Sequence, residues 1–184
     1  MKTTITKCAV LTLAASLALA APVFAGGTHG DGHGHGSSHM TMIGAPGAPG
    51  DVDREIRVKL GEMFFSPSSI EVERGETIRF IVTNTGEFVH EFNIATAEMH
   101  REHHEEMMKM METGALEADR INHAMMMAGH MAHDDPNSVL LEPGKAAEVI
   151  WTFAGDARIE VSCNVPGHRE SGMIAPIRIE GRSS

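Results

Sequence analysis

Short runs of alternating apolar and polar residues recur from residue 54 onward, and they constrain the fold more than any other feature of the chain. In the first run, Ile56, Val58 and Leu60 alternate with charged neighbours. The same period of two recurs at residues 70–72, 78–82, 149–153, 159–163 and 177–179. Turn-forming residues separate the runs at 66–67, 74–76, 84–86, 142–144 and 154–156. Short half-buried strands with regular turns predict an all-β antiparallel sandwich or barrel.

One loop after the 159–163 run carries three side chains with metal-binding chemistry. Cys163, His168 and Met173 follow a Cys-x4-His-x4-Met spacing, which places a thiolate, an imidazole and a thioether on one tight loop. Together with a second imidazole, these are the ligands of a mononuclear blue-copper centre, in which Met is the weak axial ligand. Zinc sites use Cys, His and carboxylate ligands, so the Met argues against zinc. Taken alone, Cys163 could be a buried structural thiol, but its neighbours favour a copper ligand.

The first 25 residues have the features of a secretory signal peptide. Lys2 and Lys7 precede an apolar, Ala-rich run at 9–21, and residues 23–25 end in a small residue suited to cleavage. The apolar run is too short to span a membrane. We therefore expect a periplasmic protein without membrane insertion, in which Cys163 is the remaining cysteine once Cys8 is removed.

The charge of the chain excludes two classes of partner. Removal of residues 1–25 deletes two lysines and no acidic residues, so the formal net charge changes from −10 to about −12. A protein this acidic is not expected to bind nucleic acid or an anionic membrane surface.

Residues 26–51 are rich in Gly, His, Ser and Pro, and we expect a disordered His/Gly-rich tail there. Such a segment buries too little apolar surface to offset the entropy lost on ordering its backbone. It is either a solvated linker or, because His-rich tracts bind metals, an additional metal-binding segment. The folded domain is expected over 52–184.

A Met- and His-rich segment, about 97–133, interrupts the strand pattern. Residues 96–137 contain nine of the fourteen methionines and half of the twelve histidines. β-branched residues are scarce there, which predicts two helices, about 97–112 and 115–132, with a break at Thr113-Gly114. Two sets of side chains share helical faces: His100, His104, Met107, Met108 and Met111 in the first helix, and His123, Met126, Met127, His130 and Met131 in the second.

These faces have two interpretations. Met is an adaptable apolar filler, so the stripes could pack on the β-domain. Thioethers and imidazoles are also donors for Cu(I), and imidazole is a poor core residue, which favours metal binding over packing.

The strand and loop motifs together resemble the cupredoxins, the small Greek-key copper domains of plastocyanin, pseudoazurin and rusticyanin. The matching pieces are residues 65–67, 70–77, 84–86 leading to His90, 141–145 and the Cys163 loop. The resemblance covers 54–95 and 138–181. It implies that His90 is the first imidazole ligand, Cys163 the thiolate, His168 the second imidazole and Met173 the axial thioether of a copper ion.

The layout of export signal, His-rich leader and Met/His-rich insertion resembles the periplasmic copper-tolerance cupredoxins of the CopI type. This resemblance implies a role in resisting excess copper, with electron transfer at the site of one Cys, two His and one Met, and further copper ions on the Met/His-rich segments. The alternative is a plain electron shuttle between periplasmic redox enzymes, with the insertion as a docking face for a partner protein. A copper enzyme is disfavoured because no His-x-His pair lies in a strand, although the sequence leaves oxidation of Cu(I) to Cu(II) open.

Overall fold

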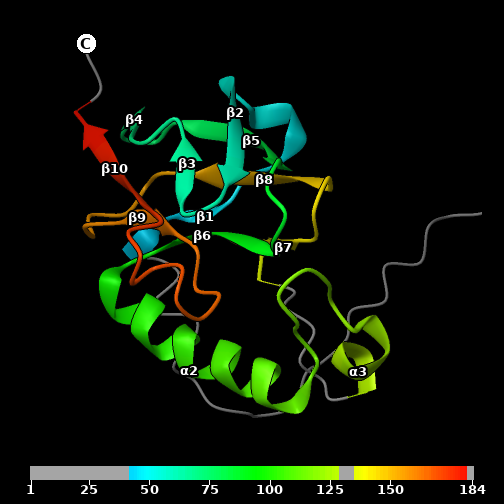
Figure 1. The fold of residues 1–184 in the computed structure, drawn as a ribbon. Coiled ribbons are helices and arrows are strands. Elements are labelled where there is room, and N and C mark those ends of the chain that lie inside the picture. Colours follow the sequence, from blue (N-terminus) through cyan, green and yellow to red (C-terminus); the bar gives the residue numbers. More distant parts are fainter. Residues whose placement is uncertain (1–41, 129–134, 182–184) are drawn as a thin grey trace, which may run out of the picture. The chain divides into compact units, whose positions relative to one another are not determined.

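Two five-stranded β-sheets form the protein in a computed structural model, which describes residues 42–128 and 135–181 (Figure 1). The first sheet has the order β1 (Ala45–Pro46), β8 (Ala146–Thr152), β5 (Thr77–Asn84), β2 (Arg54–Gly61), β3 (Phe64–Ser66). The second has the order β4 (Ile70–Glu73), β10 (Ile174–Glu180), β9 (Glu160–Ser162), β6 (His90–Ala95), β7 (Ser138–Leu141). The expected all-β sandwich is confirmed.

The strand pairing is mixed rather than purely antiparallel. β2 pairs with β5 in parallel, and β4 pairs with β10 in parallel, while the other pairs are antiparallel. The parallel pairing of β2 and β5 follows from the path of the chain. After β3 the chain crosses to the second sheet as β4, and it then returns to the first sheet as β5, which runs beside β2 in the same direction. Alternation within a strand reports only which face is buried, so it does not distinguish these pairings.

Aromatic side chains from both sheets fill the space between them. The ring of Phe80 on β5 lies 5.2 Å from that of Phe92 on β6 and 6.1 Å from that of Phe153, measured between ring centroids. Trp151 on β8 is fully buried and belongs to the same hydrophobic core. Contacts between the two sheets therefore determine which face of β6 points into the core. Because side chains alternate along a strand, they also determine the direction of the side chains at the first residues of β6.

The folded unit begins earlier than the expected boundary at residue 52. Ile43 is fully buried, its carbonyl accepts a hydrogen bond of 3.0 Å from the Trp151 indole, and β1 pairs with β8. Gly44 permits this approach, since its φ is 122° and a Cβ there would lie 2.2 Å from the Thr152 carbonyl oxygen. Residues 42–51, which include a 3-10 helix at Pro49–Asp51, thus belong to the domain and not to a disordered tail. The expected signal peptide and residues 26–41 lie outside the described residues.

The described part of the insertion, residues 97–128, contains one long helix and one short one. α2 (Ala97–Thr113) begins at Thr96, whose hydroxyl accepts from the Met99 amide, and ends at Gly114 with φ 76°. The expected second helix is wrong for residues 115–122, which form a turn with a bridge between Leu116 and Ile121. Helix α3 spans His123–Ala128, and the rest of the predicted second helix, residues 129–132, lies outside the described residues.

The turn forms because its apolar residues are needed in the core. Ala115 and Leu116 are buried, and the Asn122 amide donates to the Ala115 carbonyl. The Asn122 side chain then accepts from the Met125 amide (3.2 Å) at the start of α3. Tertiary packing thus overrides the helix propensity of this segment.

Strand β6 is buried on both faces, because α2 lies beside it (Figure 1). Phe92 points into the core between the sheets, so Glu91 and Asn93 belong to the opposite face, on which α2 packs. Within residues 42–128 and 135–181, none of the helices combines the length and apolar character that a membrane span requires.

Candidate metal centre

Three of the four expected ligands meet at one end of the sandwich. His90 is the first residue of β6, Cys163 directly follows β9, and His168 lies in the loop between β9 and β10. Within 42–128 and 135–181, they are the one group of three His, Cys, Asp or Glu side chains placed to share a metal ion. All three are buried.

The donor atoms point toward one another. The two Nδ1 atoms of His90 and His168 are 3.2 Å apart, and the Cys163 Sγ lies 3.3 Å from Nδ1 of His168 and 4.0 Å from Nδ1 of His90. Metal bonds of about 2.0–2.3 Å to nitrogen and sulfur require two ligands of one ion to lie within about 4.3 Å of each other. All three separations satisfy this limit, so the residues fit a common metal ion.

Burial favours the neutral form of all three side chains. Burial lowers the pKa of His90 from 6.5 to about 4, with a further contribution from His168, and it lowers the pKa of His168. Burial raises the pKa of the Cys163 thiol from 9.0 to about 12. Neutral imidazoles are ready to bind a metal, whereas the thiolate needs a bound cation to compensate its desolvation.

Hydrogen bonds close the loop that carries the ligands. The His168 amide donates to the Val165 carbonyl at 3.0 Å, and the Met173 amide donates to the His168 carbonyl at 3.0 Å. The Cys163 amide donates to the Met173 carbonyl at 3.2 Å, which ties the two ends of the loop together. The Met173 side chain is fully buried, and its role as a ligand stays a prediction.

Asn84 holds the turn that precedes His90. Its side-chain amide donates to the carbonyls of Phe88 (2.7 Å) and Leu141 (2.8 Å), and its side-chain oxygen accepts from the Gly86 amide (3.0 Å). Gly86 leaves room for two side chains there, because a Cβ would lie 2.3 Å from a Glu62 carboxylate oxygen and 2.9 Å from the His90 Nε2. The sequence indicates a turn at 84–86 but not that the asparagine side chain is fully buried and bonded in this way.

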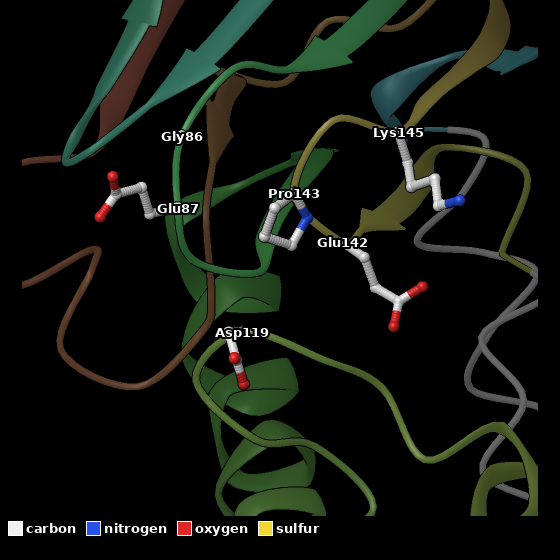
Figure 2. Close-up of a pocket in the computed structure, with 6 residues that line it drawn as sticks. All are labelled: Gly86, Glu87, Asp119, Glu142, Pro143 and Lys145. Carbon is white, nitrogen blue, oxygen red and sulfur yellow. The ribbon is translucent and has the colours of Figure 1, made fainter.

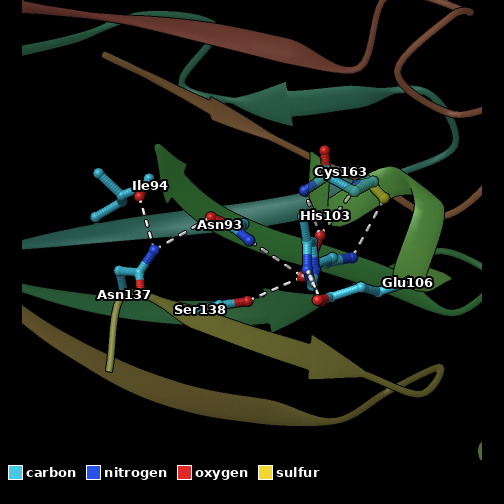
Figure 3. A network of polar contacts seen from close by, with 9 residues as sticks. Asn93, Ile94, His103, Glu106, Asn137, Ser138 and Cys163 are labelled. Atoms are coloured by element: carbon cyan, nitrogen blue, oxygen red, sulfur yellow. Dashed lines mark hydrogen bonds and ion pairs between the residues drawn. The ribbon is translucent and has the colours of Figure 1, made fainter. Parts of the chain in front are cut away.

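Glu91 is the functional residue that sequence reasoning missed. Its amide donates to the Cys163 Sγ at 3.3 Å, and its carboxylate, only 1 % exposed, accepts from the Asn164 side chain at 2.7 Å. His103 of α2 lies 2.8 Å from the same carboxylate, in the polar network drawn in Figure 3. The sequence does show a charged residue directly after His90. Its partner, His103, lies twelve residues further along the chain on the insertion, and the sequence does not indicate that the two meet.

An open hollow of about 550 Å³ lies beside the turn at Gly86 and does not include the candidate ligands. Figure 2 shows the acidic side chains that line it together with Lys145. One of them, Glu142, accepts a hydrogen bond of 3.0 Å from the Ile121 amide, which lowers the pKa of this carboxyl group. The hollow therefore lies where the insertion is attached to the sandwich.

The Met and His side chains of the insertion divide into buried and exposed sets, so the predicted faces are not uniform. His100, Met107 and Met126 are buried, whereas Met108 and Met111 are 40 % and 39 % exposed. The exposed methionines of the described insertion are Met108, Met111, Met125 and Met127. The predicted face of α2 therefore includes both side chains that are buried against the β-domain and side chains that are exposed. The period of the sequence does not show where the boundary between them lies. His130, Met131 and His133 lie outside the described residues.

Comparison with known proteins identifies relatives of the whole folded region. The family described as copper-binding proteins of the plastocyanin/azurin family matches residues 52–180. A copper-resistant cuproprotein CopI of Pseudomonas aeruginosa is 42 % identical over 154 residues, which cover 78 % of this chain and 85 % of the relative. A protein of the same name from Rubrivivax gelatinosus is 33 % identical over 180 residues, covering 96 % of this chain and 98 % of the relative.

A solved structure supports the fold independently. Reduced auracyanin from the photosynthetic bacterium Roseiflexus castenholzii matches with a TM-score of 0.51 and 19 % identity, covering 70 % of this chain and 98 % of auracyanin. At this identity the similarity shows a shared β-sandwich fold.

Proposed function

The chain belongs to the plastocyanin/azurin family of copper-binding proteins, with copper as its cofactor, and we propose that it is an exported copper-tolerance protein. The ligands in this proposal are His90, Cys163, His168 and Met173. The observation that carries it is the meeting of two imidazole Nδ1 atoms and one thiolate sulfur within 4.0 Å in a buried site. Copper in such a site supplies one-electron exchange between Cu(II) and Cu(I). We propose no catalytic role.

The residues around the ion contribute rigidity and exclusion of water. Asn84 and the closed loop from Cys163 to Met173 fix the ligands before the metal arrives. The Glu91 amide supplies a hydrogen bond to the thiolate sulfur. A site held in this way needs little rearrangement when the charge of the ion changes, which suits electron transfer.

The insertion supplies donors for further copper ions in this proposal. Four exposed thioethers, those of Met108, Met111, Met125 and Met127, are accessible to soft ions without unfolding the domain. Met107, Met110 and Met126 are buried in the hydrophobic core and serve packing instead. Copper tolerance in the named relatives and the periplasmic location expected from the signal peptide agree with a protein that buffers copper outside the cytoplasm.

Titration of the copper-loaded mature protein with Ag(I), a mimic of Cu(I), tests this part of the proposal. We expect more than one ion per chain in total, and loss of the excess when the four exposed methionines are changed together to Leu. Changing Met107, Met110 and Met126 to Leu is the matched control and should leave the excess in place, since Leu conserves volume. One ion per chain in every variant would refute storage by the insertion.

Growth in copper tests the tolerance role itself. Deletion of the gene should lower the copper concentration that the native host tolerates, and the wild-type gene should restore it. Cys163→Ser should not restore it fully. A deletion strain with unchanged tolerance would contradict the proposed role.

The second candidate is an electron shuttle, and one surface feature favours it. Phe88 is 39 % exposed, and its ring centroid lies 6.4 Å from that of His168. An exposed apolar side chain beside a ligand offers a redox partner protein a docking surface from which electrons have a short path to the metal. Unchanged copper tolerance together with loss of a respiratory or other redox activity on deletion would support the shuttle instead.

A further inference from the structure

The Glu91 carboxylate is buried next to the metal site, and several donors surround it. It accepts from the Asn164 side chain (2.7 Å), the Asn164 amide (3.1 Å) and the Ser138 hydroxyl (2.9 Å), and lies 2.8 Å from the His103 Nε2. The Asn93 side-chain amide is a more distant donor, at 3.4 Å. Burial of a carboxylate is costly, and these donors offset the cost.

This carboxylate joins the two segments that carry the metal ligands. Glu91 follows His90 on β6, and Asn164 follows Cys163 on the ligand loop. The Glu91 amide also donates to the Cys163 sulfur at 3.3 Å. A displacement of Glu91 would therefore change the hydrogen bond to the thiolate and the position of both segments at once.

The insertion supplies the cationic partner of Glu91. His103 lies on the buried face of α2, and its side chain is 10 % exposed. Its burial opposes protonation, but the hydrogen bond and charge of Glu91, with help from Glu106 at 3.0 Å, raise its pKa to about 9. At neutral pH the pair is an imidazolium and a carboxylate, and the negative charge of Glu91 is compensated by a residue outside the sandwich.

The insertion also touches the other side of the His90 segment. The Val89 amide donates to the Ala118 carbonyl at 2.7 Å, in the turn that follows α2. The segment from Val89 to Glu91 is thus held by the insertion at both ends. The contact at Glu91 differs from that at Val89 because it changes the charge next to the thiolate.

We propose that His103 is a positioning residue through which the insertion helix sets the reduction potential of the copper centre. It holds Glu91 so that its amide points at the Cys163 sulfur, and it neutralises the carboxylate beside that sulfur. A hydrogen bond and a compensated charge near the thiolate both favour Cu(I), which leaves more negative charge on the site. This inference rests on copper binding at the proposed ligands.

The test is the reduction potential and visible spectrum of the copper-loaded mature protein and three variants. His103→Gln should leave the Glu91 charge uncompensated and favour Cu(II) over Cu(I) about tenfold, a fall of about 59 mV for a one-electron couple. Glu91→Gln combined with His103→Gln removes both charges and should bring the potential back toward the wild-type value. A purely structural role for His103 predicts no such recovery.

Arg101→Gln is the matched control, because it removes an exposed positive charge from the same helix without a contact to Glu91. Its potential should stay at the wild-type value. Should His103→Gln not fold, Glu91→Gln alone and the double variant carry the comparison. The single variant removes the hydrogen bond and the charge that favour a protonated His103, so both variants lack the charged pair and both potentials should lie near the wild-type value.

The outcomes separate this inference from the proposed function. Wild-type protein without thiolate-to-copper absorption would refute the proposed function and with it the inference. Wild-type protein with that absorption, and His103→Gln with unchanged potential and spectrum, would refute the inference alone. A double variant whose potential lies well below that of the wild-type protein would also refute it.

Discussion

The Glu91–His103 ion pair should make the stability of the copper-free protein depend on pH above neutrality. The folded state raises the pKa of His103 from 6.5 to about 9, so the pair contributes fully below pH 6.5 and is lost as pH rises through 9. The same pair lowers the pKa of Glu91 to about 2, and that contribution is lost only as pH falls below 4.5.

The magnitude follows from the pKa of His103. At about 1.4 kcal/mol per pKa unit, its increase corresponds to about 3 kcal/mol of unfolding free energy lost between pH 6.5 and 9. The lowered pKa of Glu91 and the raised pKa of His103 arise from the same ion pair, so the free energy that corresponds to the Glu91 pKa is not added. Below pH 6.5 the trend reverses, because His90 and His100 have pKa values lowered to about 4 and must take up protons on unfolding. Stability should therefore be highest near pH 6.5.

Urea denaturation of the chelator-treated, reduced protein across pH 5 to 10 measures this curve. His103→Gln should lower the unfolding free energy at pH 6.5 by about 3 kcal/mol and flatten the curve between pH 6.5 and 9. Arg101→Gln should keep the slope. A flat wild-type curve in that window, or a variant that keeps the slope, would refute the assignment of a charged pair.

Three further substitutions test the site and its support. Ile43→Ala should lower the unfolding free energy by about 2–5 kcal/mol in urea denaturation, and no loss would show that residues 42–51 are not part of the core. Asn84→Ala removes three hydrogen bonds and should cost about 3 kcal/mol while weakening copper binding in competition with a chelator; unchanged affinity would remove Asn84 from the site's support. Met173→Leu should raise the reduction potential and shift the visible bands, and an unchanged spectrum and potential would exclude Met173 as a ligand.

Alternation predicted the sandwich, and motif spacing predicted that Cys163 and His168 lie close together on one loop. The loop from Cys163 brings its own ligands together because their separation along the chain is short. His90 is distant in sequence, and only the family resemblance placed it in the site. Sequence patterns of this kind carry information about neighbours along the chain and about which face of a strand is buried.

The features that were missed depend on contacts between distant segments. The pairing of Glu91 with His103 requires the position and rotation of α2 on β6, which the sequence does not specify. Burial of Ile43 depends on the Trp151 indole on β8, and no local pattern in the Gly- and Pro-rich segment indicates it. The turn at 115–122 replaces a predicted helix because Ala115 and Leu116 are buried in the core.

Copper content and visible absorption of the purified mature protein test the central claim most directly. The site of His90, Cys163, His168 and Met173 predicts one tightly bound copper ion with an intense thiolate-to-copper band. In Cys163→Ser that band should vanish while the circular dichroism of the β-sandwich is retained, because the aromatic core does not depend on the ion. A Cys163→Ser variant that keeps the band, or a wild-type protein that binds no copper, would contradict the account.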